Sequence, residues 1–268
     1  MATGAKISND CALHMKTAIF LSIREKATRL PGKVLRAIHG KTACEHLIDR
    51  LKQARKADLL LMTTSTHPDD LVLCEMATRT GIPFFRGSEE DKLDRYLRAA
   101  ETFDVDFMVI VDGDDLFCSE EHIDLTIEAY GRTHSDYISQ QGLPLGAACF
   151  GIRQQALKTV CELKQERDTE VWGGYFTESG LFQVHMIQVE DPILHRPDIR
   201  MTLDYEEDLR FFEAVIAGLF HDAEVPTFRE VMTYLGDHPE IVALNQSVQE
   251  KYERNLHRAR PVRMRQNV

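Results

Sequence analysis

The chain has 268 residues, of which 43% are hydrophobic, and its formal net charge is −11. This length and apolar content predict one large domain, or one domain with a small appendage. The acidic balance argues against a nucleic-acid partner, and no apolar run approaches the roughly 18 residues of a membrane-spanning helix.

The cysteines and the N-terminal region indicate where the protein works. The six cysteines are widely spaced, with no C-x-x-C pair and no close group with histidine, which favours reduced thiols in a cytosolic protein. The N-terminus lacks the apolar core of a signal peptide. We therefore expect a cytoplasmic protein in which the polar residues 1–15 form a disordered or frayed extension.

Apolar runs of strand length alternate with helical patterns along the first half of the chain. The runs predict strands at 17–23, 57–65, 82–87 and 105–115. The 3.6-residue patterns between and after them predict helices at 43–55, 68–81, 89–103 and 119–132. This order predicts an α/β fold of the Rossmann-like type, with a mixed, mainly parallel sheet and helices on both faces.

The second half of the chain changes character. Strands are expected within 135–140, 145–152, 181–190 and 199–203, with longer connections that bear glycine, and a clear helical pattern returns at 205–220. The last forty residues are helical in composition but weakly patterned. We predict a main domain at 16–224 and a C-terminal helical extension at 225–268, whose basic final stretch from His257 is read as a solvated tail.

Charged side chains follow three of the predicted strands. Arg24 follows the first strand, Asp114 stands at the end of the fourth between Asp112 and Asp115, and Asp204 follows the strand at 199–203. In open α/β sheets, ligands bind beyond the carboxyl ends of the strands. The loop at 23–33, IREKATRLPGK, is thus either an anion-binding site or a charged surface turn, since it has only one glycine.

The aspartates at the strand ends suggest a metal. Asp114 and Asp204 could share Mg²⁺, which prefers oxygen ligands and keeps waters and substrate phosphates. A basic loop beside such an ion is what phosphoryl or nucleotidyl transfer needs. The alternatives are that DGDD at 112–115 is a solvated turn with a helix cap, and that Asp204 is an ordinary N-cap.

Several motifs, in their order along residues 17–220, resemble one enzyme family. They are T-R-L-P-G-K-V-L at 28–35, G-K-x-x-x-E-H at 40–46, R-G-S-x-x-D-x-L-D-R-Y at 86–96, D-G-D-D-L-F at 112–117 and L-D-Y-E-E-D-L at 203–209. They resemble the cytidylyltransferases that activate sugar acids, such as CMP-ulosonate and CMP-acylneuraminate synthetases, and most of all their spore-coat-polysaccharide branch.

The resemblance implies a glycosyltransferase-A-like fold and a reaction in which an acceptor oxygen attacks the α-phosphate of CTP and releases pyrophosphate. It implies Mg²⁺ as cofactor, CTP and an acidic sugar as substrates, and a homodimer. The residues that it assigns to catalysis and the triphosphate are Arg24, Arg29 and Lys33. Those that it assigns to the metal are Asp114 and Asp204, and further nucleotide contacts fall on Thr28, Arg86, Gly87, Ser88 and Asp112.

The chain also departs from the family pattern. Lys26 and Ala27 replace a Gly-Ser pair in the first loop, and Asp112 replaces a threonine or glutamine. The metal framework is retained, while contacts of the loop and the base are altered. A glycosyltransferase that uses Asp112 and Asp114 as a D-x-D motif, and a non-catalytic homologue, remain as alternatives. The triphosphate-gripping loop argues against the first, and the retained charged residues argue against the second.

The acceptor pocket is expected in the middle of the chain. Its candidate residues are Glu170, Trp172, Tyr175 and His185. Trp172 could stack on a sugar or serve as a core or interface aromatic, and Glu170 could be a specificity contact or a base. His185 lies among apolar neighbours, where a buried structural role is the competing interpretation.

Overall fold

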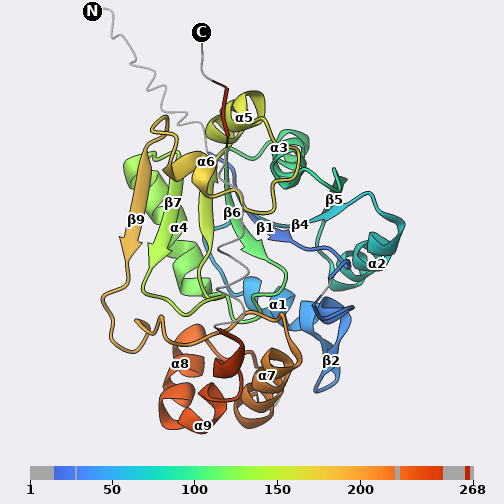
Figure 1. Ribbon diagram of the computed structural model, residues 1–268, viewed down its shortest axis with the longest axis vertical. Helices are drawn as coiled ribbons and strands as arrows, with labels where there is room; N and C mark the ends of the chain where they lie inside the picture. The colour runs from blue at the N-terminus through green and yellow to red at the C-terminus, as the bar shows by residue number, and fades with distance from the viewer. Residues whose placement is uncertain (1–14, 28, 221–223, 250–262, 266–268) are drawn as a thin grey trace, which may run out of the picture.

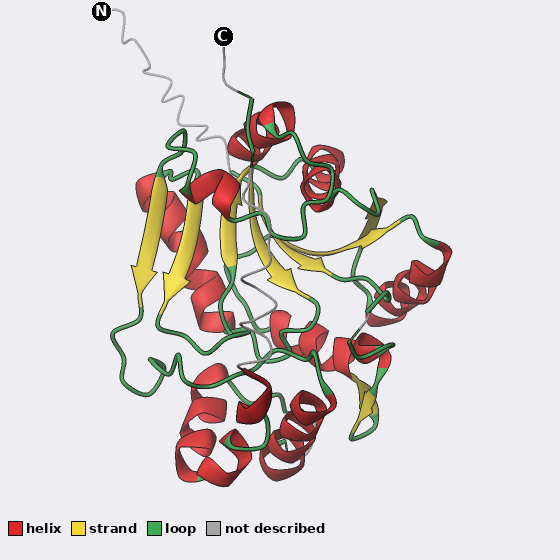
Figure 2. Cartoon of the chain, viewed as in Figure 1, coloured by secondary structure: helices red, strands yellow, loops and turns green. Residues whose placement is uncertain are grey.

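The computed structural model describes residues 15–27, 29–220, 224–249 and 263–265. Its centre is a seven-stranded sheet in the order β5-β4-β1-β6-β8-β7-β9, in which β8 runs antiparallel to the other six strands (Figures 1 and 2). The strands are β1 (Thr17–Ser22), β4 (Leu59–Ser65), β5 (Phe84–Gly87), β6 (Phe107–Asp112), β7 (Tyr137–Gln141), β8 (Phe150–Arg153) and β9 (Val184–Gln188). The extension predicted at 1–15 lies outside the described residues except for Met15, and so does most of the basic stretch after residue 256.

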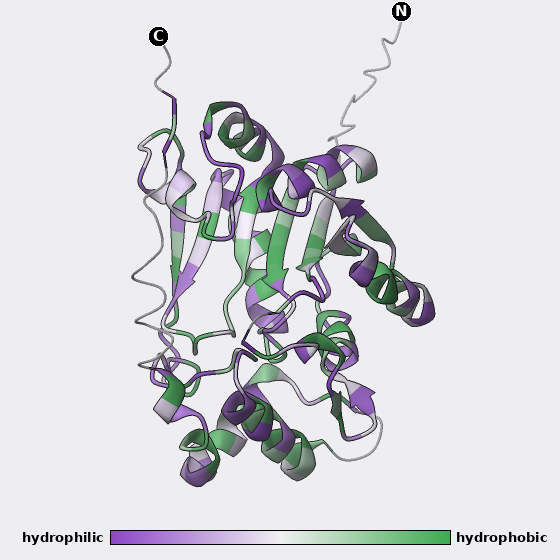
Figure 3. Ribbon diagram, turned by 45° about the vertical axis from the view of Figure 1, so that its right-hand side comes forward, coloured by the Kyte–Doolittle hydropathy of each residue, from purple (hydrophilic) through white to green (hydrophobic). Residues whose placement is uncertain are grey.

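The central strands are buried on both faces, as their continuous apolar runs predict. All six residues of β1 are buried. Ile19 and Leu21 join the core on one face of the sheet, whereas Ala18 and Phe20 join the core on the other. Successive side chains of a strand point to opposite faces, so a strand between two helical layers must be apolar throughout. The middle of the sheet is accordingly strongly hydrophobic in Figure 3.

Helices cover both faces of the sheet, and the predicted fold class is confirmed. The core on one face includes side chains of α1 (Ala43–Leu51), α2 (Leu71–Thr80) and α4 (Glu120–Thr133). The core on the other face includes side chains of α3 (Lys92–Phe103), α5 (Gln154–Leu163) and α6 (Gly174–Thr177). Short elements complete this part of the chain: the hairpin of β2 (Ala37–Ile38) and β3 (Lys41–Thr42), and the 3₁₀-helices η1 (Lys33–Leu35) and η2 (Pro68–Asp70).

A third cluster of helices lies at the end of the sheet, in the lower part of Figure 1. It contains α7 (Glu206–Leu219), α8 (Phe228–Asp237), α9 (Pro239–Val242) and the 3₁₀-helix η3 (Gln246–Val248). Phe212 of α7 meets Phe117 with ring centroids 4.9 Å apart, and Phe228 of α8 lies in the same buried cluster. Helices α8 and α9 of the C-terminal region therefore pack on α7, while the domain boundary at residue 224 stays a prediction.

The structure differs from the sequence expectations at several elements. Residues 199–203 do not form the strand that was predicted there, since their one ladder contact is a bridge between Arg200 and Leu145. The strand expected at 145–152 begins only at Phe150, because a turn precedes it. Helix α5 and the β2–β3 hairpin were not predicted. Among the described residues, no helix is long and apolar enough to cross a lipid bilayer.

Candidate active site

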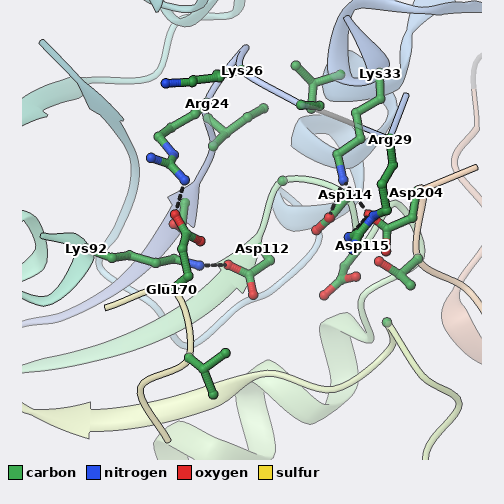
Figure 4. Close-up of a pocket in the computed structure, with 18 of the residues that line it drawn as sticks. Arg24, Lys26, Arg29, Lys33, Lys92, Asp112, Asp114, Asp115, Glu170 and Asp204 are labelled. Carbon is green, nitrogen blue, oxygen red and sulfur yellow. Dashed lines mark hydrogen bonds and ion pairs between the residues drawn. The ribbon is translucent and has the colours of Figure 1, made fainter. Parts of the chain in front are cut away.

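A cleft of about 1460 Å³ opens at the carboxyl ends of β1 and β6 (Figure 4). Charged side chains dominate its lining. The basic ones are Arg24, Lys26, Arg29, Lys33, Lys92, Arg95 and Arg167. The acidic ones are Glu89, Glu90, Asp112, Asp114, Asp115, Asp168, Glu170 and Asp204. Because basic and acidic side chains are nearly equal in number, the cleft is built from ion pairs and is not a uniformly basic site for anions.

The first loop reaches this cleft through a tight turn. The amide of Lys33 donates to the carbonyl of Leu30 at 3.2 Å, and Gly32 between them has a φ of +67°. That left-handed conformation suits glycine at the third position of such a turn, after a proline at the second. Leu30 is buried, which anchors the turn in the core. The single glycine of the loop thus serves the turn that positions Lys33. Thr28 lies outside the described residues.

Four charged residues form what we call the Lys33 cluster: Arg29, Lys33, Asp114 and Asp204. Lys33 Nζ donates to Asp114 Oδ2 at 2.6 Å and to Asp204 Oδ1 at 2.9 Å. Arg29 Nη2 donates to the same Asp204 oxygen at 2.6 Å. The Lys33 side chain is only 13% exposed and that of Asp204 only 3%. One ammonium therefore bridges two carboxylates from distant parts of the chain.

Burial and the neighbouring charges act in opposite directions on Lys33 and Asp204 in this cluster. Burial by itself would lower the pKa of Lys33, but the Asp114 and Asp204 carboxylates outweigh it, and the pKa is raised well above its usual value. Burial would likewise raise the pKa of Asp204, but the Lys33 charge and the Arg29 hydrogen bond outweigh it and the pKa is lowered. These buried groups remain ionised at neutral pH because they neutralise each other.

Close backbone packing positions Asp114. The amide of Gly113 donates to the carbonyl of Ser22 at the end of β1, at 2.8 Å. A Cβ atom on Gly113 would lie 2.5 Å from Cγ1 of Ile23, which is too close for any other residue. The glycine between Asp112 and Asp114 therefore lets the turn after β6 press against the loop that carries the basic residues.

A different contact brings Asp204 to the same place. The amide of Leu203 donates to the carbonyl of Asp114 at 2.8 Å, so the extended segment before α7 lies against the turn after β6. Asp208 accepts hydrogen bonds from the amides of Asp204 and Tyr205 at 2.9 and 3.0 Å. Because Tyr205 is the N-cap of α7 and Asp208 satisfies these amides, the Asp204 side chain is not an ordinary cap and points into the cleft.

The opposite half of the cleft contains what we call the Arg24 cluster: Arg24, Lys92, Asp112 and Glu170 (left in Figure 4). Arg24 forms an ion pair with Glu170, and it also donates to the carbonyl of Glu89 at 2.8 Å. Lys92 Nζ donates to Asp112 Oδ1 at 2.6 Å. Here each cation has its own carboxylate, in contrast to the shared arrangement around Lys33.

The donor set fits a hard divalent cation. Among the residues that the structure describes, no three His, Cys, Asp or Glu side chains gather into a ready-made metal site. Asp114 and Asp204, however, converge on one nitrogen, so their oxygens lie close enough to share one ion. Mg²⁺ is commonly held by one or two carboxylates, with waters and substrate phosphates completing its shell.

Three of the predicted nucleotide contacts lie beside the cleft rather than in its lining. Arg86 donates to the carbonyls of Ser65 and His67, at 3.1 and 3.0 Å, and so ties down the end of β4. Ser88 accepts from the amide of Asp91 in the turn before α3. Gly87 also acts indirectly. Because it has no side chain, Arg95, which lines the cleft, can pack against it.

The predicted acceptor residues are divided between the cleft and the core. Glu170 lines the cleft. Trp172 is buried among aromatic rings, and its ring centroid is 5.5 Å from that of Phe150. Tyr175 is buried and donates to Glu166 at 2.7 Å. His185 lies on the edge strand β9 and does not line the cleft.

Two further candidates, Lys92 and Asp115, were missed from the sequence. Lys92 is the first residue of α3, and its side chain is only 11% exposed. A cation at the positive end of a helix dipole is unfavourable, so a lysine at the start of a predicted helix is a sign that could have marked Lys92 as functional. Asp115 lines the cleft, and burial together with the charges of Asp114 and Asp112 raises its pKa well above the usual value. In the sequence, nothing separates Asp115 from the other aspartates of DGDD, because only its burial in the folded chain sets it apart.

Known proteins share both the sequence pattern and the fold. The spore coat polysaccharide biosynthesis protein SpsF of Bacillus subtilis is 26% identical over 227 residues, covering 82% of this chain and 94% of that protein. The 3-deoxy-manno-octulosonate cytidylyltransferase 2 of Hydrogenovibrio crunogenus is 29% identical over 127 residues, 46% of this chain and 50% of that one. The structure of a cytidylyltransferase from Leptospira borgpetersenii superposes with a TM-score of 0.77 at 22% identity, covering 85% and 97% of the two chains, which shows a shared fold.

The family itself is matched over most of the chain. The sequence profile of the cytidylyltransferases covers residues 18–234, which run from within β1 through the Lys33 cluster to within helix α8. The resemblance drawn from the motifs is thereby confirmed, and so is the class of enzyme. This chain belongs to the cytidylyltransferase family, a family of nucleotidyltransferases.

Proposed function

We propose that this protein transfers CMP from CTP to a hydroxyl oxygen of a sugar acid and releases pyrophosphate, with Mg²⁺ as cofactor. The Lys33 cluster carries the proposal, because it places two carboxylates and two cations together at the end of a cleft. The named relatives support the acceptor class, since one of them is a 3-deoxy-manno-octulosonate cytidylyltransferase.

The proposed reaction is an in-line displacement at the α-phosphorus of CTP. The acceptor oxygen forms a bond to phosphorus and gives up its hydroxyl proton to water, the bond to the oxygen that bridges to the β-phosphate breaks, and pyrophosphate leaves with that electron pair. Lys33 and Arg29 donate hydrogen bonds to the phosphate oxygens that gain negative charge. Arg24, across the cleft, holds the outer phosphates and so keeps the leaving group in line.

Asp114 and Asp204 would hold the Mg²⁺ ion. When bound, the ion neutralises phosphate charge and orients the oxygens of the triphosphate. In this structure the Lys33 ammonium pairs with both carboxylates. With these carboxylates engaged by the ion, the Lys33 ammonium would be available to donate to the phosphate oxygens of CTP.

Two alternative functions are less well supported. A glycosyltransferase would use a finished nucleotide sugar and would not need three cations along a triphosphate. A non-catalytic homologue would not need Lys33, Asp114 and Asp204 to converge. A cytoplasmic location and a homodimer remain part of the proposal, carried over from the cysteine pattern and from relatives.

The proposal is tested by measuring pyrophosphate release with CTP, Mg²⁺ and a panel of sugar acids that begins with 3-deoxy-manno-octulosonate. The expected result is release that depends on CTP, on the metal and on one acceptor class. No release with any acceptor, together with no CTP binding in calorimetry, would contradict it. Turnover of a CMP- or UDP-sugar without CTP would favour the glycosyltransferase.

A further inference from the structure

One wall of the cleft is built by the segment 163–171, which joins α5 to α6. Arg167, Asp168, Glu170 and Val171 of this segment line the cleft. After Leu163, the last residue of α5, the segment has no helix or strand beyond a single bridge residue. A connection of this kind needs outside contacts to hold one conformation, so the contacts that it makes decide what it presents to the cleft.

The first of these contacts comes from residues 263–265, far along the chain. Met264 pairs with Lys164 in an antiparallel bridge. The amide of Gln165 donates to the carbonyl of Arg263 at 3.1 Å, and the amide of Arg265 donates to the carbonyl of Leu163 at 2.8 Å. In Figure 1 the segment 263–265 is the red piece beside α5.

Side chains reinforce this pairing. Met264 packs against the buried cluster that contains Trp172 and Phe176. Glu166 accepts hydrogen bonds from the Tyr175 hydroxyl at 2.7 Å and from the amide of Arg263 at 3.3 Å. Residues 263–265 are thus joined both to the connection and to the core beneath it.

A second set of contacts fixes the same segment to the start of α3. Thr169 is fully buried; its hydroxyl accepts from the amide of Leu93 at 3.1 Å and donates to Asp91 at 3.2 Å. Lys164 forms an ion pair with the other oxygen of Asp91. Lys164 and Thr169 both bind Asp91, and Glu170, which follows Thr169, therefore lies in the cleft.

Glu170 then meets Arg24, which lies 146 positions away in the sequence. Arg24 follows β1 in the loop that we assign to the triphosphate. A carboxylate and a phosphate bind a guanidinium through the same hydrogen-bond geometry. Glu170 and a phosphate cannot both occupy the same Arg24 nitrogen, which pairs with Glu170 in this structure.

We propose that residues 263–265 are a positioning element of the active site: they hold the segment 163–171 so that Glu170 occupies Arg24 and competes with the triphosphate. The competition rests on the proposed role of Arg24 in binding CTP. The positioning of the segment 163–171 does not depend on that role, because it follows from contacts within the chain.

The test uses a pair of variants at one residue. Arg265→Pro removes the amide that donates to Leu163, whereas Arg265→Ala keeps that amide and removes the same side chain. We expect hydrogen–deuterium exchange in the peptide 163–171 to rise at least about tenfold in Arg265→Pro and to stay unchanged in Arg265→Ala. Deletion of residues 263–268, compared with deletion of 266–268, is the second pair, and melting curves verify folding.

CTP binding in the presence of Mg²⁺, measured by calorimetry, tests the competition. Glu170→Gln should bind CTP about two- to fivefold more tightly than the unaltered protein, since a partly exposed ion pair of this kind is modest in strength. Arg265→Pro should show the same change, and the double variant should bind no more tightly than either single variant. A merely structural role for residues 263–265 would weaken CTP binding instead.

The positioning and the competition can be refuted separately. Unchanged exchange in both Arg265→Pro and the deletion of 263–268 would overturn the positioning. Unchanged or weaker CTP binding by Glu170→Gln would overturn the competition. If the unaltered protein binds no CTP, the proposed function fails and the competition fails with it, while the exchange measurement still decides the positioning.

Discussion

The two halves of the cleft solve the same electrostatic problem in different ways. In the Lys33 cluster, one ammonium serves two carboxylates, and the pair with Asp204 is almost fully buried. In the Arg24 cluster, Arg24 is paired with Glu170 and Lys92 with Asp112, and the two carboxylates are 49% and 35% exposed. Shared, buried charges are costly to separate unless another ion replaces the partner, whereas exposed pairs exchange partners with solvent and ligands easily. The first half is therefore suited to a metal and to chemistry, and the second to reversible substrate binding.

The sharpest test of this comparison is Asp114→Ala. Loss of one metal carboxylate should lower kcat/KM by at least about a hundredfold, because charge at the reacting phosphate is then no longer neutralised. Pyrophosphate release measures the loss, and an unchanged circular dichroism spectrum shows that the fold is kept. Asp112→Asn, two residues away in the other cluster, should lose much less. An active Asp114→Ala enzyme would contradict the metal assignment.

Lys33→Met separates the two roles of the shared ammonium. Without Lys33, Asp114 loses its ammonium partner and Asp204 keeps only its arginine partners, so the site carries one positive charge less and Mg²⁺ should bind more tightly in the absence of CTP. Turnover should nevertheless fall, by about a hundredfold, because a donor to the reacting phosphate is lost. Calorimetry with MgCl₂ and pyrophosphate release measure the two effects. Weaker Mg²⁺ binding by Lys33→Met would refute the view that Lys33 and the metal share one pair of carboxylates.

Lys92→Met probes the Arg24 cluster. Its partner Asp112 faces the cleft and can be solvated, so we expect a change of about tenfold or less, seen mainly in KM. The measurement is steady-state kinetics at varied CTP and at varied acceptor. A loss in kcat as large as that of Lys33→Met would show that the two halves of the cleft do not divide their tasks as described.

The smallest expected effect is on stability in acid. Folding lowers the pKa of Asp204, so this group stabilises the folded state above its unfolded pKa of about 3.9 and ceases to do so as the pH falls through its folded value. Asp204→Asn should therefore flatten the loss of stability below about pH 4. Urea unfolding at several pH values measures the slope. An unchanged slope in Asp204→Asn would place the acid sensitivity elsewhere.

Much of the site could be predicted because its residues follow strands directly. Arg24 and Asp114 stand two residues beyond β1 and β6, and the rule for parallel sheets brings such positions together. Asp204 was found through its motif, although the strand expected before it is absent. Its position instead depends on a hydrogen bond between Leu203 and Asp114, which no local pattern encodes.

Other residues could not be placed in this way. Trp172 and Tyr175 stand in a segment with glycines that suggests a binding loop, yet the burial of aromatic surface draws both into the core. Arg86 belongs to a recognisable motif, but its guanidinium is used to satisfy backbone carbonyls at the end of β4. Lys92 is the reverse case, because it lines the cleft but was not predicted to do so. A lysine on an amphipathic helix is normally solvated.

The sequence by itself determined the alternation of strands and helices, the family and the charged residues at the strand ends, because these depend on local periodicity and short motifs. Only the tertiary structure decided the pairing of charges. Lys33 bridges Asp114 and Asp204, and Glu170 meets Arg24 across the cleft. The physical reason is that an ion pair depends on distances of a few ångströms between segments that are far apart in the chain, and chain order carries no such distance.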